Sequence, residues 1–187
     1  MGMPTIRRLR REEGLERVSI RMGDITTLEV DAIVNAANST LLGGSGVDGM
    51  IHWAAGSGLL EECRTVGWCP AGEARITAGY NLPARFVIHT VGPVYGVDRE
   101  NAPRLLASCY ENCLALAVQH TIRTIAFPAI SCGAYGYPVE EACKIALDTT
   151  ISFLERNKIP EKVFFVLYSC RDYAAYWEYY ATKTANG

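Results

Sequence analysis

The sequence predicts an α/β protein: a three-layer α/β/α sandwich around a central mixed, mostly parallel sheet. Short apolar runs of strand length alternate with segments whose apolar residues recur at helical spacing, an order typical of parallel sheets with helical connections. Several of these runs have no polar alternation, which indicates strands buried on both faces. The length of 187 residues and the hydrophobic content of 49% fit one domain with a substantial core.

The first third of the chain contains a charged segment, two strands and a helix. Residues 1–17 are dense in charge and are expected to form a solvated arm or helix, while residues 18–187 form the domain. Val18–Met22 alternates apolar and polar residues, as a half-buried strand does. Ala32–Ala37 is a second strand, and Val47–Ala55 has one apolar helical face.

Four more strands and three more helices follow. The strands are expected at Ala74–Tyr80, Phe86–Val91, Thr124–Ile130 and Val163–Tyr168. The helices are expected at Pro103–His120, at 138–157 and at Tyr173–Lys183. Pro138 suits the first position of its helix, because the N–H that proline lacks would have no partner there. We find no internal repeat, linker or low-complexity tract in this series.

The charge balance disfavours a polyanionic partner. The chain has 18 Lys and Arg against 20 Asp and Glu, a net charge of −2, so it has no overall basic field to hold nucleic acid or an anionic membrane. A local basic cluster consists of Arg7, Arg8, Arg10 and Arg11. Besides a solvated arm, this cluster permits two other interpretations: a docking patch for an acidic partner, and an RNA contact.

The cysteines and the apolar pattern indicate a cytoplasmic protein. The seven cysteines are odd in number and form no CxxC pair, which favours structural thiols in a reducing compartment over a metal site or a disulfide framework. Residues 1–18 contain no apolar core of a secretory signal. No run reaches the roughly 18–20 apolar residues of a membrane span, so no membrane association is expected.

Two glycine-containing loops carry the main functional signal. Asn38–Gly49 and Ser131–Pro138 each follow a predicted strand and lead into a helix. Glycine lets backbone N–H groups turn toward a ligand, and the first helical turn leaves N–H donors unpaired at its positive end, which suits phosphate oxygens. Either loop alone is compatible with a plain connection. Because both lie at carboxyl ends of strands, where open α/β sheets bind ligands, the pair would fit a diphosphate.

Other chemistries fit these loops less well. Gly44, Gly46 and Gly49 form a literal G-x-G-x-x-G. Several residues separate them from the preceding strand, however, and the acid at suitable spacing, Glu73, precedes the next strand, so the match to a dinucleotide-binding turn is poor. A thiol phosphatase built on Cys132 lacks an arginine in the same loop to hold the phosphate.

Six short motifs occur in order over residues 18–180. They are Gly23–Thr26, Val30–Asn38, Leu41–His52, Gly72–Ala74, His89–Pro93 and Phe127–Pro138. In this combination the chain resembles a macrodomain, and specifically the MacroD-type branch. The resemblance implies a macrodomain fold that binds ADP-ribose. It also implies hydrolysis of mono-ADP-ribose esters on Asp or Glu side chains of modified proteins and of O-acetyl-ADP-ribose, with no cofactor and no metal.

The resemblance also assigns ADP-ribose contacts by position. Asp24 matches the acid that accepts from the adenine amino group, with the Ile25 backbone beside it, and Tyr168 is a candidate for adenine stacking. Asn38 and Asp48 match the polar residues at the distal ribose. The diphosphate cradle is matched by the amides of Gly44, Ser45, Gly46, Val47, Ser131, Cys132, Gly133, Ala134 and Tyr135. Tyr135 would also cover the distal ribose.

The catalytic candidates implied by the resemblance are Asp48, Asn38 and His52. Asn38 would orient the distal ribose, and Asp48 would orient or deprotonate the attacking water. Alternatively, the ligand's own phosphate is the base and Asp48 has an orienting role only. His52 is four residues after Asp48, on the same helix face, so it either hydrogen-bonds to Asp48 or is a structural histidine. The alternative function is a reader module that binds ADP-ribose without turnover.

Three residues depart from the pattern of that branch. Ser45 stands where glycine is usual, Cys132 where threonine is common, and Trp53 where arginine is frequent. None of these changes affects Asn38 or Asp48. We therefore expect them to alter kinetics and leaving-group preference rather than the reaction itself.

Overall fold

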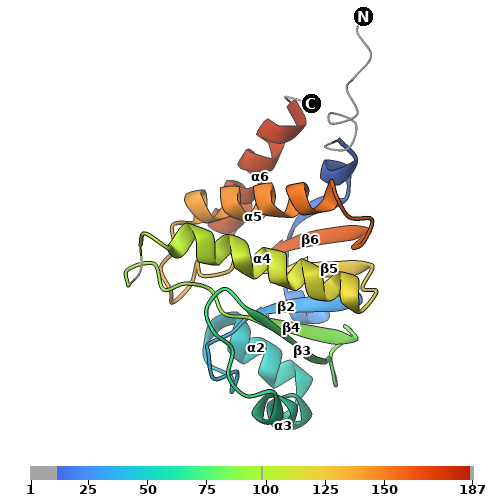
Figure 1. The fold of residues 1–187 in the computed structure, drawn as a ribbon, viewed down its shortest axis with the longest axis vertical. Coiled ribbons are helices and arrows are strands. Elements are labelled where there is room, and N and C mark those ends of the chain that lie inside the picture. Colours follow the sequence, from blue (N-terminus) through green and yellow to red (C-terminus); the bar gives the residue numbers. More distant parts are fainter. Residues whose placement is uncertain (1–11, 98, 186–187) are drawn as a thin grey trace, which may run out of the picture.

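The computed structural model describes residues 12–97 and 99–185 and contains a six-stranded sheet (Figure 1). Its strands are β1 (Val18–Met22), β2 (Ala32–Ala36), β3 (Ala74–Ala78), β4 (Phe86–Thr90), β5 (Thr124–Phe127) and β6 (Lys162–Leu167). They lie in the order β1-β6-β5-β2-β4-β3, and every neighbouring pair is parallel except β3 with β4. The predicted mixed, mostly parallel sheet is confirmed.

Helices cover both faces of this sheet. They are η1 (Ile25–Thr27), α2 (Gly46–Ala55), α3 (Ser57–Val66), α4 (Ala102–Gln119), α5 (Val139–Leu154) and α6 (Cys170–Ala185). Figure 1 shows α4 and α5 side by side, apart from α2 and α3. Successive strand residues point to opposite faces: in β2, Val34 packs in the core with α4, α5 and α6, whereas Ile33 packs with α2 and α3. The three-layer sandwich is therefore confirmed.

Most predicted elements begin and end within three residues of the observed ones. β5 ends at Phe127 instead of Ile130, because Pro128 has no N–H to extend the ladder. Tyr168 lies just after β6 instead of inside it. α3 was not predicted, although its apolar residues recur at helical spacing; Leu59 and Cys63 are its buried residues.

The N-terminal segment is described only in part. Arg7, Arg8, Arg10 and Arg11 lie outside the described residues, while residues 12–16 are helical. Leu15 is buried in the core under α4, α5 and α6. The end of this segment thus packs against the domain, and the division between residues 17 and 18 stays a prediction.

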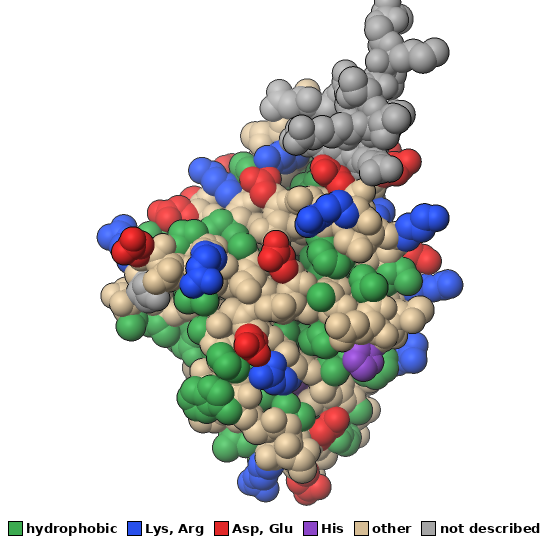
Figure 2. Space-filling model, viewed as in Figure 1, with side chains coloured by type: hydrophobic (Ala, Val, Ile, Leu, Met, Phe, Trp, Pro, Cys, Tyr) green, Lys and Arg blue, Asp and Glu red, His purple; other side chains and the backbone are tan. Residues whose placement is uncertain are grey.

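Within the described residues, charges of both signs are mixed on the surface and most thiols are buried. On the face in Figure 2, basic and acidic side chains are interspersed, in keeping with the net charge of −2. Five of the seven cysteines are buried, namely Cys63, Cys69, Cys109, Cys113 and Cys143. Within residues 12–97 and 99–185, no helix combines the length and the apolar character needed to cross a lipid bilayer.

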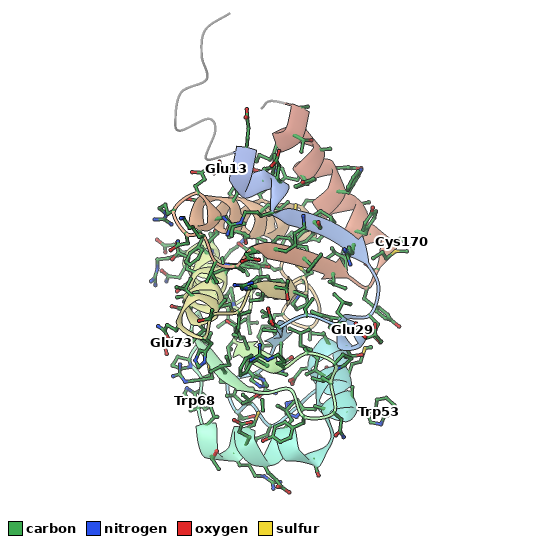
Figure 3. The ribbon with its side chains drawn as sticks, turned by 90° about the vertical axis from the view of Figure 1, so that its right-hand side faces the viewer. Glu13, Glu29, Trp53, Trp68, Glu73 and Cys170 are labelled. Carbon is green, nitrogen blue, oxygen red and sulfur yellow. The ribbon has the colours of Figure 1, made fainter. Side chains whose placement is uncertain are left out.

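The parallel strands direct several loops to one edge of the sheet. β1, β6, β5 and β2 run the same way, so their carboxyl ends lie together. Figure 3 shows the arrow of β1 ending toward Cys170, the first residue of α6. The Gly23 N–H donates to the carbonyl of Leu167 at 3.0 Å and fixes the exits of β1 and β6 beside each other. β4 is parallel to β2 as well, so any site at this edge can draw on residues from five strands.

Candidate functional site

A cavity of about 260 Å³ lies at the carboxyl ends of β2 and β5. One wall is the loop from β2 into the first turn of α2, and the other is the loop after β5. The lining residues are Ala36, Ala37, Asn38, Gly44, Ser45, Gly46, Val47, Asp48, Gly92, Ala129, Ser131, Gly133, Ala134 and Tyr135. The structure thus brings both predicted glycine loops, with ten of the predicted site residues, to one cavity.

The first wall depends on glycine where the chain enters α2. Gly46, the first residue of α2, has φ of 61°, a left-handed conformation that glycine adopts without steric cost. Ser45 is the N-cap residue, and its side chain makes no capping hydrogen bond within the described chain. The N–H groups of this first turn lie at the positive end of the helix dipole and suit an anion.

The second wall presents three consecutive backbone amides. In the part of the chain that the structure describes, the N–H groups of Gly133, Ala134 and Tyr135 donate to no other residue. The loop is closed by the Tyr137 N–H, which donates to the carbonyl of Ser131 at 2.9 Å. Successive free amides of this kind form a concavity that binds anions without a basic side chain.

Asp48, in the first turn of α2, is the buried acid of the cavity. Its side chain is 4% exposed. Oδ1 accepts a hydrogen bond from Asn35 Nδ2 at 2.7 Å, whereas Oδ2 has no partner among the described residues. Burial raises the pKa of Asp48 above its usual range, while the hydrogen bond from Asn35 and the nearby His52 act in the opposite direction. Oδ2 is thus a basic, unoccupied acceptor.

Asn38 braces the glycine loop beside this acid. Its Nδ2 donates to the carbonyl of Gly43 at 2.9 Å, and its Oδ1 accepts from the backbone N–H and the hydroxyl of Thr40 at 3.0 and 2.6 Å. A methyl group on Gly44 would lie 2.9 Å from Asp48 Oδ2 and 3.3 Å from Asn38 Nδ2. Because Gly44 has no side chain, one ligand group in the cavity can reach both Asp48 Oδ2 and Asn38 Nδ2.

Three predicted adenine contacts lie at the same sheet edge but outside this cavity. Asp24 follows β1 and accepts from the N–H and the hydroxyl of Thr26 at 2.9 and 2.7 Å, which caps η1. Ile25 is buried in the core under α2 and α3. Tyr168 follows β6 and is 77% exposed. Because β1 and β6 are neighbours, Asp24 and Tyr168 sit at adjacent strand exits.

Two further predicted residues do not line the cavity. Cys132 turns its thiol toward the carbonyl of Ile130 at 3.5 Å, and burial raises the pKa of this thiol to about 12. His52 places Nε2 3.5 Å from Asp48 Oδ1, too far for a strong hydrogen bond. Its neighbour Trp53 is 88% exposed and points away from α2 (Figure 3).

Sequence reasoning gave no role to a group of polar residues beneath the cavity. Asn35, Thr77 and His89 lie within strands and are almost fully buried. The ligand atoms of His52, Cys63 and His89 lie within 4.8 Å of one another. The available signal was a polar side chain inside an otherwise apolar strand, as in Ala32–Ala36.

Comparisons with known proteins agree with this geometry. A family model described as Macro domain matches residues 34–146. The O-acetyl-ADP-ribose deacetylase of Citrobacter koseri is 54% identical over 156 residues, which cover 81% of this chain and 88% of that protein. The ADP-ribose glycohydrolase MACROD2 of Xenopus laevis is 55% identical over 163 residues, which cover 86% of this chain but 39% of that protein.

A solved structure extends the agreement to the fold. The Trypanosoma brucei macrodomain in complex with ADP-ribose superposes with a TM-score of 0.81 at 42% identity, covering 91% of this chain and 69% of that one. The mixed six-stranded sheet between two helical layers is the macrodomain fold. On fold and sequence together, the chain belongs to the Macro domain family, in its MacroD-type branch.

Proposed function

We propose that the protein binds ADP-ribose and hydrolyses mono-ADP-ribose esters from Asp and Glu side chains of modified proteins, and also O-acetyl-ADP-ribose. One observation carries this proposal: Asp48 presents a buried Oδ2 to a cavity whose two walls offer backbone amides, and neither Oδ2 nor these amides have a partner within residues 12–97 and 99–185. The amides suit a diphosphate, and the acid stands beside them. Two relatives, an O-acetyl-ADP-ribose deacetylase and an ADP-ribose glycohydrolase, support hydrolysis.

The proposed hydrolysis requires an oriented ester, a positioned water and a group that accepts the proton of this water. Water attacks the ester, the ester bond breaks, and the products are a free carboxylic acid and ADP-ribose. Asp48 Oδ2 would hold this water and accept its proton, a role favoured by the pKa that burial raises. The amide walls would fix the diphosphate and Asn38 the distal ribose, so the reacting groups meet already oriented.

Adenine would lie toward the exits of β1 and β6. Asp24 keeps one carboxylate oxygen for the η1 cap and leaves the other for the adenine amino group. The exposed ring of Tyr168 is placed to stack on the base. In this arrangement the ligand spans the edge from β1 to β2, and the partners are ADP-ribosylated proteins acting in the cytoplasm, which localisation of a tagged chain would test.

The test compares wild type, Asp48→Asn and Asn38→Ala on a glutamate-linked ADP-ribosylated protein. We expect wild type to release ADP-ribose and Asp48→Asn to lose at least about 100-fold in rate, the usual effect of removing a general base. Calorimetry with ADP-ribose separates binding from turnover, and Asp48→Asn should still bind. ADP-ribose binding without release by wild type would identify a reader module and overturn the proposal.

A further inference from the structure

Beneath the cavity, four side chains from four elements form a continuous buried hydrogen-bonded chain. Asn35 on β2 and His89 on β4 are register partners, Thr77 lies on β3, and Asp48 lies in the first turn of α2. Asn35 Nδ2 contacts Asp48 Oδ1 at 2.7 Å and His89 Nδ1 at 3.1 Å. His89 Nε2 contacts Thr77 Oγ1 at 3.0 Å. All four residues are at most 3% exposed, so water does not compete for these bonds.

The carboxylate at one end sets the direction of the whole chain. An amide nitrogen has two hydrogens, and Asn35 Nδ2 must give one to Asp48 and the other to His89 Nδ1. His89 Nδ1 is then an acceptor, so the ring proton is on Nε2 and is donated to Thr77 Oγ1. The Thr77 hydroxyl in turn donates to the carbonyl of Ala78 at 3.2 Å. Asn35 thus donates in both directions, toward Asp48 and toward His89. Thr77 Oγ1 also lies 3.5 Å from the carbonyl of Val87, and His89 Nε2 also lies 3.8 Å from Cys63 Sγ.

The reversed order is incompatible with a charged Asp48. It would turn Asn35 Oδ1, which accepts nothing from the described residues, toward Asp48 Oδ1, and two acceptors 2.7 Å apart tolerate each other only if the carboxyl is protonated. It would also move the His89 proton to Nδ1. The tautomer of His89 therefore reports which order exists.

His89 contributes orientation without charge. Burial lowers the pKa of His89 to about 3, so the ring is neutral at physiological pH. In this order a proton occupies His89 Nε2, the ring nitrogen that faces Thr77 Oγ1 at 3.0 Å and Cys63 Sγ at 3.8 Å. Of His52, Cys63 and His89, only His89 is a member of the hydrogen-bonded chain.

We propose that Thr77 and His89 are positioning residues for hydrolysis: they lock the Asn35 amide so that it occupies Asp48 Oδ1 and leaves Oδ2 to the reacting water. This inference rests on the proposed function. Neither residue lines the cavity, so both act through Asn35. Loss of the Thr77 acceptor would free the His89 ring to change tautomer or tilt, and the second hydrogen of Asn35 would lose its partner.

The first experiment compares Thr77→Val with Thr77→Ser, which differ in the hydroxyl. We expect Thr77→Val to lower kcat about tenfold or more, the range seen for outer-shell orienting groups. KM and the Kd for ADP-ribose should stay within about twofold, because no ligand contact is lost. Thr77→Ser, which keeps the hydroxyl, should recover most of the turnover. Thr150→Val is the matched control, since Thr150 is equally buried, on α5, and its hydroxyl has no partner in the described chain.

A second experiment measures the tautomer of His89, which differs between the two orders of the hydrogen bonds. Nitrogen-15 NMR of histidine-labelled protein should show His89 as a non-titrating Nε2–H tautomer between pH 5 and 8. An Nδ1–H tautomer, or a Thr77→Val enzyme with the kcat of Thr150→Val, would overturn the positioning role. Absence of any turnover by wild type would instead overturn the proposed function, and the NMR result would still decide the order of the chain.

Discussion

At the scale of single residues, Asp48 serves two opposing requirements. A proton acceptor works best when its pKa lies near the working pH, and burial moves the pKa of Asp48 in that direction. The same burial makes the charged form costly in the folded protein. One hydrogen bond from Asn35 offsets part of this cost. The part of this cost that the hydrogen bond does not offset lowers the free energy of unfolding. The proposed role of Asp48 as a proton acceptor would explain why an acid is present at this position.

This penalty gives a pH-dependent prediction for Asp48→Asn. The folded-state pKa is raised above the unfolded value, so between these two pKa values the folded protein binds more protons, and the free energy of unfolding falls as pH rises. At pH 7 we expect Asp48→Asn to be more stable than wild type by on the order of 1 kcal/mol. The difference should shrink as pH falls below the folded pKa of Asp48 and vanish below its unfolded pKa. Thermal unfolding from pH 4 to 8 measures it, and a pH-independent difference would contradict the argument.

At the scale of elements, the start of α2 is unusual in its N-cap residue, Ser45. A serine at the N-cap position normally accepts from the first helical turn, and its replacement by alanine costs about 0.5–2 kcal/mol. The Ser45 side chain makes no such bond in the described chain and lines the cavity. The departure from glycine at this position thus adds a hydroxyl to the cavity wall that we propose binds the diphosphate.

Ser45→Ala should therefore affect binding more than folding. We expect a loss of stability below about 0.5 kcal/mol, because no capping bond is removed, and a Kd for ADP-ribose raised about threefold to tenfold, because one hydrogen bond to the ligand is lost. Urea unfolding and calorimetry measure the two effects. Ser169→Ala is the matched stability control, since Ser169 Oγ does accept from the Asp172 N–H at 3.0 Å near the start of α6. Equal stability losses in the two variants would refute the assignment.

The elements also show what the sequence could predict. Strand length, apolar runs and glycine positions anticipated the sheet and both loops of the cavity, because these signals are local. α3 escaped prediction although its apolar residues recur at helical spacing, because it is polar overall and Gly56 alone separates it from α2. The pairing of Asn35 with His89 escaped as well: it depends on the register of β2 against β4, strands 54 residues apart at these positions. Local patterns carry no information about such a register.

At the scale of the whole molecule, the strand order separates two ends of the site. The exits of β1 and β6 carry Asp24 and Tyr168, and β5 lies between them and β2, which leads to Asp48. The spacing of residues in the sequence does not show that the exits of β1 and β6 are neighbours, because residues at these two exits are more than 140 positions apart. The resemblance to macrodomains supplied these contacts, and the topology gives them a physical basis. Binding and chemistry should accordingly be separable by mutation.

Asp24→Asn tests that separation. Asp24 Oδ1 can keep both hydrogen bonds from Thr26 in the variant, while the other oxygen becomes an NH₂ group that repels the adenine amino group. We expect the Kd and KM for ADP-ribose substrates to rise about tenfold, the effect of about 1.4 kcal/mol for a lost polar contact, with kcat unchanged. The hypoxanthine analogue, with a carbonyl in place of the amino group, should bind Asp24→Asn better than wild type. Calorimetry with both ligands decides it: a variant that weakens both equally, or that lowers kcat, would show that Asp24 does not read the base.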